Sequence, residues 1–283
     1  MKQLKDKIKN HRIDGIISIL GVVASTYEED FAFELENDED FQKGQEQQYT
    51  LKEKHRLGSD YHRILSTSIN DYGCLIDGEY YKNFSSHGDN ELYLYIDDVN
   101  FQKCEVTLRG SVVADLLAVG FDSPVVKYDV HGLTKAEYDN LDLFQELVYE
   151  SYLLELRGDY KISLFSYFTA LEALVASYLE NYKSSIHSEL HYSLEHLALD
   201  DKVRIICKEA YGISTFTNVQ LWGEFMNIFK KVKSKRNEIA HAKSNVVVDS
   251  EDLDNIVYCL CNLIAILEVS AHDFNDVRKH IFK

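Results

Sequence analysis

The sequence predicts an α+β protein with two domains, a strand-rich N-terminal domain (β-sandwich or barrel-like) over residues 1–135 and an all-α antiparallel helical bundle over residues 136–283. Two observations predict this division. In the first half of the chain, short apolar segments with alternating or β-branched residues are separated by turn signals. From about Leu133 onward, apolar residues recur at spacings of three and four, which is the period of amphipathic helices.

The first half contains segments typical of strands. Four of them are apolar, alternating or rich in β-branched and aromatic residues: 16–24, 31–36, 91–96 and 104–108. Three turn signals rich in Gly, Asp and Asn lie between them: 70–73, 77–78 and 87–90. The stretch 36–54 is polar and acidic, and we expect a long loop or a poorly ordered insertion there.

The second half contains four or five segments with helical periodicity. They are 141–154, 162–178, 201–211, 221–239 and 253–267. Gly158 separates the first two, Gly212 ends the third, and Asp249 or Ser250 caps the last. Short connections between such helices predict an antiparallel bundle.

The composition restricts the classes of function. The net charge is −17, and division at Tyr138 leaves −10 and −7 on the two parts, so neither half is basic. A protein that coats nucleic acid with its whole surface is excluded, and any such contact must come from a local patch. The apolar runs are too short for a membrane helix, the N-terminus lacks a convincing signal peptide, and the five cysteines have no framework spacing. We expect a cytoplasmic protein with reduced, mostly buried thiols.

One segment reverses the charge of the chain. Residues 229–243 hold six cations and one acid, Glu238, which gives a local charge of +5. The cations are Lys230, Lys231, Lys233, Lys235, Arg236 and Lys243. Such a cluster suits an RNA phosphate backbone. The alternative is a solvated helix face next to acidic neighbours.

Within this segment, Arg236-Asn237-Glu-Ile-Ala-His241 resembles the R-x4–6-H motif of the HEPN superfamily, in the version with Asn after Arg. The resemblance covers roughly residues 140–274. It implies a small helical bundle that cleaves RNA as a metal-independent endoribonuclease, without cofactor, in antiviral defence or growth-arresting toxin systems. It also implies a homodimer through the helical domain with a composite site. The fusion behind a strand-rich domain is most similar to the ApeA-like branch, and a phage-derived trigger or an antitoxin are the partners this implies. Arg56 and His62 have a similar spacing but lack the Asn and the helical context.

The residue types of the motif fit RNA cleavage. RNA supplies its own nucleophile, the 2′-OH, so His241 needs only to move protons near neutral pH. Arg236 would stabilise the charge that grows on the phosphate. Five residues of helix turn by about 140°, so Arg236 and His241 lie on different faces, whereas Asn237 and His241 share one. We therefore expect Asn237 to orient His241 or its phosphate.

Three further points remain open at this level. Glu172 lies in the second predicted helix and either pairs with Arg236 or is an ordinary surface glutamate. His187 and His191 have a zinc-chelating spacing, but no further ligand is evident, and solvent-facing histidines are the favoured interpretation. The motif also fits a non-catalytic HEPN-like module that binds a nucleotide, RNA or a protein.

Overall fold

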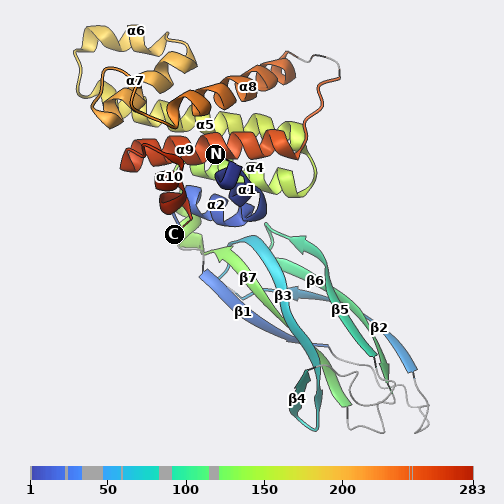
Figure 1. Cartoon of the computed structure of the whole chain (residues 1–283). Helices are drawn as coiled ribbons and strands as arrows, with labels where there is room; N and C mark the ends of the chain where they lie inside the picture. The colour runs from blue at the N-terminus through green and yellow to red at the C-terminus, as the bar shows by residue number, and fades with distance from the viewer. Residues whose placement is uncertain are drawn as a thin grey trace. The chain divides into compact units, whose positions relative to one another are not determined.

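The chain passes through a helical unit, a β unit and the helical unit again. In the computed structural model, the β unit comprises Val23–Asn140, and the helical unit combines Met1–Val22 with Leu141–Lys283 (Figure 1). The structure describes residues 2–22, 25–33, 47–58, 60–82, 91–114, 121–241, 243 and 245–282. The expected boundary near residue 135 is close to the observed one, but the first 22 residues belong to the helices and not to the strands.

The β unit consists of two antiparallel sheets. Sheet A has the order β1 (Ser25–Ala32), β7 (Phe121–Leu133), β3 (Arg63–Ile76), β4 (Glu79–Lys82). Sheet B has the order β2 (Gln47–Arg56), β6 (Glu105–Ala114), β5 (Glu91–Asn100). Buried side chains of both sheets form one core, among them Val126 and Val130 from sheet A and Leu94 and Leu108 from sheet B. The two sheets therefore pack face to face, as in a sandwich.

The strands expected over 91–96 and 104–108 are confirmed as β5 and β6, although Cys104 itself lies in the preceding turn with φ 53°. The expected loop over 36–54 is wrong from residue 47 onward, where β2 begins, while 34–46 lie outside the described residues. Among the residues of β2 whose burial is described, only Leu51 is fully buried, and Lys52 and Lys54 are exposed. A strand at a sheet edge with so few inward apolar residues resembles a polar loop in sequence.

The turn signals have different outcomes. Asp77 and Gly78 form the two-residue turn between β3 and β4, with φ 49° and 79° as a type I′ hairpin requires. The turn expected at 70–73 is wrong, because β3 continues and a register shift between Ile69 and Asp71 absorbs one extra residue. Gly73 serves strand pairing instead, since a Cβ there would lie 2.3 Å from the Tyr81 carbonyl oxygen. Residues 87–90 lie outside the described part.

All five helices expected in the second half are confirmed. They are α4 (Leu143–Leu156), α5 (Tyr160–Lys183), α7 (Leu199–Tyr211), α8 (Trp222–Ala240) and α9 (Ser250–Val269). Gly212 ends α7 in the left-handed conformation, and the Asp249 side chain caps α9. Shorter elements that periodicity did not reveal are α3 (Lys135–Asp139) in the β unit, and η2 (Ser188–Leu190), α6 (His191–Glu195) and α10 (Phe274–Ile281) in the helical unit.

The strand expected over 16–24 is wrong. The chain begins with α1 (Lys2–Asn10) and α2 (Arg12–Leu20), and Gly21 ends α2 at φ 65°. Leu4 and Ile8 are buried at a spacing of four, and Ile16, Ile19 and Leu20 at spacings of three and four. This helical stripe packs into the helical unit and overrides the β-branched composition of the segment.

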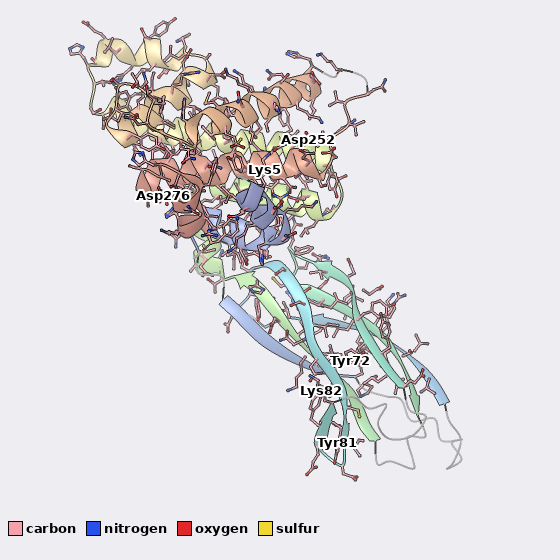
Figure 2. The ribbon with its side chains drawn as sticks, in the orientation of Figure 1. Lys5, Tyr72, Tyr81, Lys82, Asp252 and Asp276 are labelled. Carbon is pink, nitrogen blue, oxygen red and sulfur yellow. The ribbon has the colours of Figure 1, made fainter. Side chains whose placement is uncertain are left out.

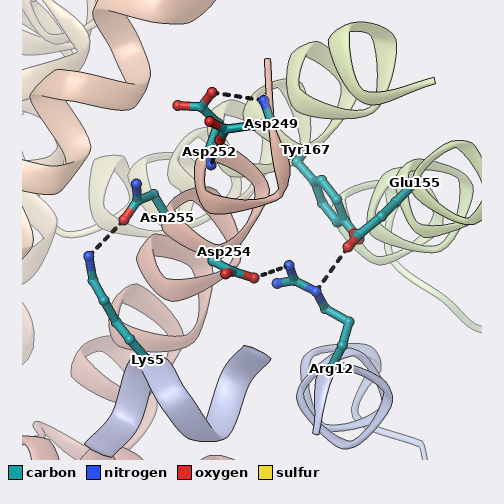
Figure 3. A network of polar contacts seen from close by, with 8 residues as sticks. All are labelled: Lys5, Arg12, Glu155, Tyr167, Asp249, Asp252, Asp254 and Asn255. Atoms are coloured by element: carbon teal, nitrogen blue, oxygen red, sulfur yellow. Dashed lines mark hydrogen bonds and ion pairs between the residues drawn. The ribbon is translucent and has the colours of Figure 1, made fainter. Parts of the chain in front are cut away.

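Polar contacts fix α1 and α2 to the other helices (Figure 3). Arg12 Nε donates to Glu155 of α4 at 3.1 Å, and Arg12 Nη2 donates to Asp254 of α9 at 2.5 Å. Glu155 also accepts a hydrogen bond from the Tyr167 hydroxyl of α5 at 3.0 Å. Lys5 Nζ donates to Asn255 at 2.8 Å. The N-terminal helices are thus bonded directly to α4 and α9, and Tyr167 links the same network to α5.

By length and composition alone, helix α5 could cross a membrane, since its mean hydropathy is 1.4 over 18 residues. Helices α9 and α10 meet the same criterion only when taken together as one span bent by 90°. Half of the α5 window is buried inside the unit, against α4, α7, α8 and α9. Figure 1 shows α5 and α9 running together among the other helices. The apolar character of α5 is that of the central helix of a bundle.

Candidate functional site

Arg236 lies in the last two turns of α8, and α5 forms its surroundings. Its guanidinium is over the rings of Phe165 and Phe168, 5.1 Å and 5.4 Å from the ring centres. Arg236 Nη2 donates to Glu172 at 3.1 Å, and Nη1 donates to the Asn237 side-chain oxygen at 3.3 Å. Two rings, a carboxylate and an amide therefore fix the plane of the guanidinium.

The Arg236 side chain is fixed by its contacts but remains accessible to solvent, since 24% of it is exposed. Its Nε–H is buried and has no hydrogen-bond partner among the described residues. An unsatisfied buried donor costs about 1–3 kcal/mol.

The structure decides between the two expectations for Glu172. Its carboxylate, 37% exposed, forms an ion pair with Arg236 across 64 residues of sequence. The pairing has no local signal in the sequence because the two residues lie on different helices.

His241 stands at the end of α8 as its C-cap residue, with φ −86° and ψ 14°. Its backbone N–H donates to the Asn237 carbonyl at 3.0 Å, and its side chain is exposed. The imidazole forms no hydrogen bond or ion pair with the described residues. The Asn237 side-chain oxygen accepts a hydrogen bond from Arg236, and the expectation that Asn237 orients His241 or its phosphate stays a prediction. One copy of the chain thus joins Arg236, Asn237 and Glu172 and leaves His241 separate.

Acidic residues from other helices neutralise much of the cationic segment. Lys233 pairs with Asp200, Lys235 with Asp252 at 2.5 Å, and Lys243 with Glu238 at 3.6 Å. Counting Asp200, Asp252 and Glu172 with Glu238 lowers the local charge from +5 to +2.

The two cations that remain are Lys230 and Lys231. Both are exposed, and neither has an ion pair with the described part of the chain. They are the best placed of the expected RNA-binding lysines to contact a phosphate directly.

Two apolar residues of the helical segment expected over 162–178 lie at the surface of the bundle. Ile162 is 60% exposed and Phe165 is 36% exposed, one helical turn apart on α5. The same helix buries Leu164, Phe168 and Leu171 on its inner face. The apolar residues of this helix extend from its buried face onto its exposed face. Periodicity alone therefore could not show which of them are exposed.

The expected metal candidates do not converge. The His187 side chain caps η2 by accepting from the Glu189 N–H, and His191 Nε2 lies 3.0 Å from the Lys183 carbonyl oxygen. In the ranges that the structure describes, no group of three or more His, Cys, Asp or Glu residues is arranged to hold a metal ion.

A pocket of about 290 Å³ is lined in part by Glu172. Its wall also contains Lys183, whose Nζ donates to Glu180 and Glu195 at 2.8 Å each. Three charged residues of this pocket, Lys183, Glu180 and Glu195, are therefore paired with one another.

The expectation of reduced, buried thiols is confirmed. All five cysteines are free and buried. Burial raises the pKa of Cys74 to about 11 and that of Cys261 to about 12. These are the properties of core residues and not of nucleophiles.

Comparison with known proteins adds no assignment: no family model, no curated protein and no solved structure matches this chain.

Proposed function

We propose that the helical unit is a HEPN-like endoribonuclease whose site contains Arg236, Asn237 and His241, with Glu172 in support. The observation that carries the proposal is the guanidinium of Arg236, which is fixed by Glu172, Asn237 and two phenylalanine rings yet partly exposed. A cation with a fixed orientation at a surface suits the charge that develops on a phosphate in the transition state. The helical unit also repels RNA less than the whole chain does, because its 20 basic and 23 acidic residues leave a net charge of only −3.

The reaction would proceed by attack of a 2′-oxygen on the adjacent phosphorus. The P–O5′ bond breaks, leaving a 2′,3′-cyclic phosphate and a 5′-OH. The proton of the 2′-OH is taken up by an imidazole, and the 5′-oxygen receives one. The exposed His241 can serve in either role near neutral pH. Arg236 would bind the equatorial phosphate oxygens.

Two copies of the helical unit would form the working site. Because the His241 imidazole touches neither Arg236 nor Asn237 within one copy, a homodimer would supply the missing proximity. Ile162 and Phe165 support this, because an exposed apolar pair beside Arg236 is suited to an interface. Lys230 and Lys231 would contact RNA phosphates, and Lys233, Lys235 and Lys243 would do so by exchanging their carboxylate partners.

The biological role follows from the resemblance to the HEPN superfamily. We propose a cytoplasmic enzyme of prokaryotic antiviral defence or of toxin-type growth arrest. Its substrate would be RNA, with tRNA as one candidate, and a phage-derived trigger or an antitoxin would control it through the β unit.

The proposal is tested by incubating the purified protein with total tRNA in EDTA, beside Arg236→Ala and His241→Ala variants. We expect cleavage by the wild type and a loss of at least 100-fold in rate in both variants. His187→Ala is the matched control, because that histidine is equally exposed on the helical unit, with 72% of its side chain accessible. Cleavage that survives in His241→Ala, or that falls equally in His187→Ala, would contradict the assignment.

The composite site is tested by mixing the two inactive variants. A heterodimer of Arg236→Ala and His241→Ala chains restores one intact site only if the arginine and the histidine of a site come from different copies. We expect recovery of activity well above that of either variant alone. Absence of recovery, with heterodimers shown to form, would place both residues of a site on one copy.

A non-catalytic binding module is the second candidate. It is favoured by the Glu172 carboxylate, which already occupies the guanidinium of Arg236, and by the separation of His241 from it. This module would bind tRNA with an affinity that depends on Arg236 and would release it uncut under every condition tested.

A further inference from the structure

The outer face of sheet B is an open surface of the β unit with a distinct set of side chains. Strand residues alternate between faces, and Leu51, Leu94, Val106 and Leu108 point into the core. Their neighbours therefore point outward. These outer residues are Thr50, Lys52 and Lys54 of β2, Arg109 and Ser111 of β6, and Tyr93 and Tyr95 of β5.

The register arranges these residues in rows across the three strands. Tyr95 lies opposite Arg109, and Arg109 lies opposite Lys52. In the next row, Tyr93 lies opposite Ser111 and Ser111 opposite Thr50. Two strand spacings separate β2 from β5, so the lysines and the tyrosines are about 10 Å apart. Each row thus runs from an aromatic ring on β5 through β6 to a polar or cationic side chain on β2.

The cations of this face lie mainly on β2 and its acids on β5 and β6. The β unit has 10 basic and 24 acidic residues, a net charge of −14, and this face holds Lys52, Lys54, Arg56 and Arg109 together with Glu91, Asp98 and Glu105. Lys52 and Lys54 are exposed at alternate positions of β2, which spaces them about 7 Å apart. Arg109 pairs with Asp97 at 3.1 Å and keeps 38% of its side chain exposed. A line of cations along β2 is the charge arrangement that an extended phosphate backbone fits.

Two tyrosines provide stacking surface on the opposite strand. The rings of Tyr93 and Tyr95 are 5.4 Å apart at an interplanar angle of 39°, and Tyr93 is 58% exposed. Bases stack on such rings irrespective of sequence, because every base has a π face.

We propose that the outer face of sheet B binds single-stranded RNA. The phosphates follow Lys52 and Lys54 along β2, and bases stack on Tyr93 and Tyr95. The Ser111 hydroxyl on β6 lies between these two lines, and the Thr50 hydroxyl lies next to Lys52 on the same face of β2; sugar 2′-hydroxyls can exchange hydrogen bonds with both. Duplex RNA does not fit, because its bases are already stacked and paired. The site is distinct from the one around Arg236 and requires no cleavage by it.

The test uses the full chain with His241→Ala, so that no RNA is cut during measurement. Fluorescence anisotropy gives Kd for a labelled 12-nucleotide RNA of mixed sequence, for DNA of the same sequence and for the RNA duplex. We expect the single-stranded RNA to bind at least tenfold more tightly than the duplex and measurably more tightly than the DNA. Adding Tyr93→Ala, or Lys52→Ala with Lys54→Ala, should raise Kd about tenfold.

Tyr81→Ala and Lys82→Ala are the matched controls, since these residues lie on β4 of sheet A (Figure 2). Both should leave Kd within twofold, as should Tyr93→Phe, which retains the ring. Three results would overturn the proposal: unchanged affinity in the sheet B variants, equal affinity for the duplex, or equal or tighter binding of DNA. A protein partner on this face would give the first result. Because the protein tested is catalytically inactive by design, these outcomes are independent of whether the wild type cleaves RNA.

Discussion

Arg236 shows how one side chain can be placed by contacts that no sequence window contains. Phe165, Phe168 and Glu172 all come from α5, and only Asn237 is a sequence neighbour. The motif singled out Arg236, Asn237 and His241 as candidates, and the Glu172 pairing was one of two open alternatives. The neutralisation of Lys233 and Lys235 by Asp200 and Asp252 could not be counted from the segment alone, because these acids approach from α7 and α9.

Glu172 acts on Arg236 as a positioning residue, and its replacement should separate this role from stability. Glu172→Ala should lower the rate of RNA cleavage about tenfold, because the guanidinium loses its main restraint, while Glu172→Gln retains an acceptor and most of the rate. The ion pair is partly exposed, so the free energy of unfolding should fall by less than about 1 kcal/mol. Steady-state cleavage rates and urea denaturation measure the two effects. A large loss of stability without loss of rate would make Glu172 a purely structural residue.

The buried cysteines lead to a prediction on reactivity. Burial raises the pKa of Cys74 to about 11 and that of Cys261 to about 12, so their thiols stay protonated at pH 8 and inaccessible to reagents. Titration of the native protein with a thiol reagent should modify none of the five cysteines within minutes. After denaturation, all five cysteines should react with the reagent. Rapid modification of one cysteine in the native state would place it outside the core.

Among the elements, long helices were the most predictable. Helices α5, α8 and α9 each repeat the helical period over several turns, and the Asp249 side chain caps the start of α9. The β2 strand and the helix α2 were not predictable, for opposite reasons. An edge strand has few inward apolar residues, whereas α2 is short and β-branched, and its helical state depends on packing against the distant α4 and α9.

Arg12 should be the residue on which the packing of α2 depends most. Its ion pairs with Glu155 and Asp254 are nearly buried, and removal of one partner from such a network costs about 3–5 kcal/mol. Arg12→Ala should therefore destabilise the helical unit by about 3 kcal/mol. The fluorescence of Trp222, the single tryptophan, reports unfolding of this unit. Lys5→Ala, which removes one bond to Asn255, is the control and should cost about 1 kcal/mol. Equal effects of the two changes would contradict the central place of Arg12.

The same network has a pH dependence with a defined sign. Burial raises the pKa of Glu155, and Arg12 offsets this only in part. A carboxyl group whose pKa is raised in the folded state stabilises the fold at pH values below its unfolded-state pKa of 4.5. This stabilisation is lost as the pH rises through the folded-state pKa. Glu155→Gln has no such titration. The stability of the wild type relative to Glu155→Gln should thus be highest near pH 4.5 and fall toward pH 7. Chemical denaturation at several pH values measures this difference, and a rise with pH would contradict it.

At the scale of the whole molecule, the β unit is an insertion into the helical unit. The chain leaves the helices after Val22 and returns to them at Leu141. The two ends lie close together, because Gln145 Nε2 donates to the Leu20 carbonyl oxygen at 2.7 Å. The units also differ in charge, with −14 on the β unit and −3 on the helical unit. An insertion with adjacent ends and its own core is expected to fold separately from its host.

This organisation predicts that the β unit can be removed only if the first 22 residues are kept. A chain in which a short Gly-Ser linker replaces residues 23–140 should fold, with Trp222 fluorescence and helical circular dichroism close to those of the helical unit in the full protein. A chain of residues 136–283 alone should not fold stably. It lacks Leu4, Ile8, Ile16 and Ile19, which complete the core, and it lacks Arg12, the cation that pairs with Glu155 and Asp254. The linked chain should retain RNA cleavage and lose the tight binding of single-stranded RNA assigned to sheet B. If residues 136–283 fold as well as the linked chain, α1 and α2 are accessory to the helical unit and not part of its core.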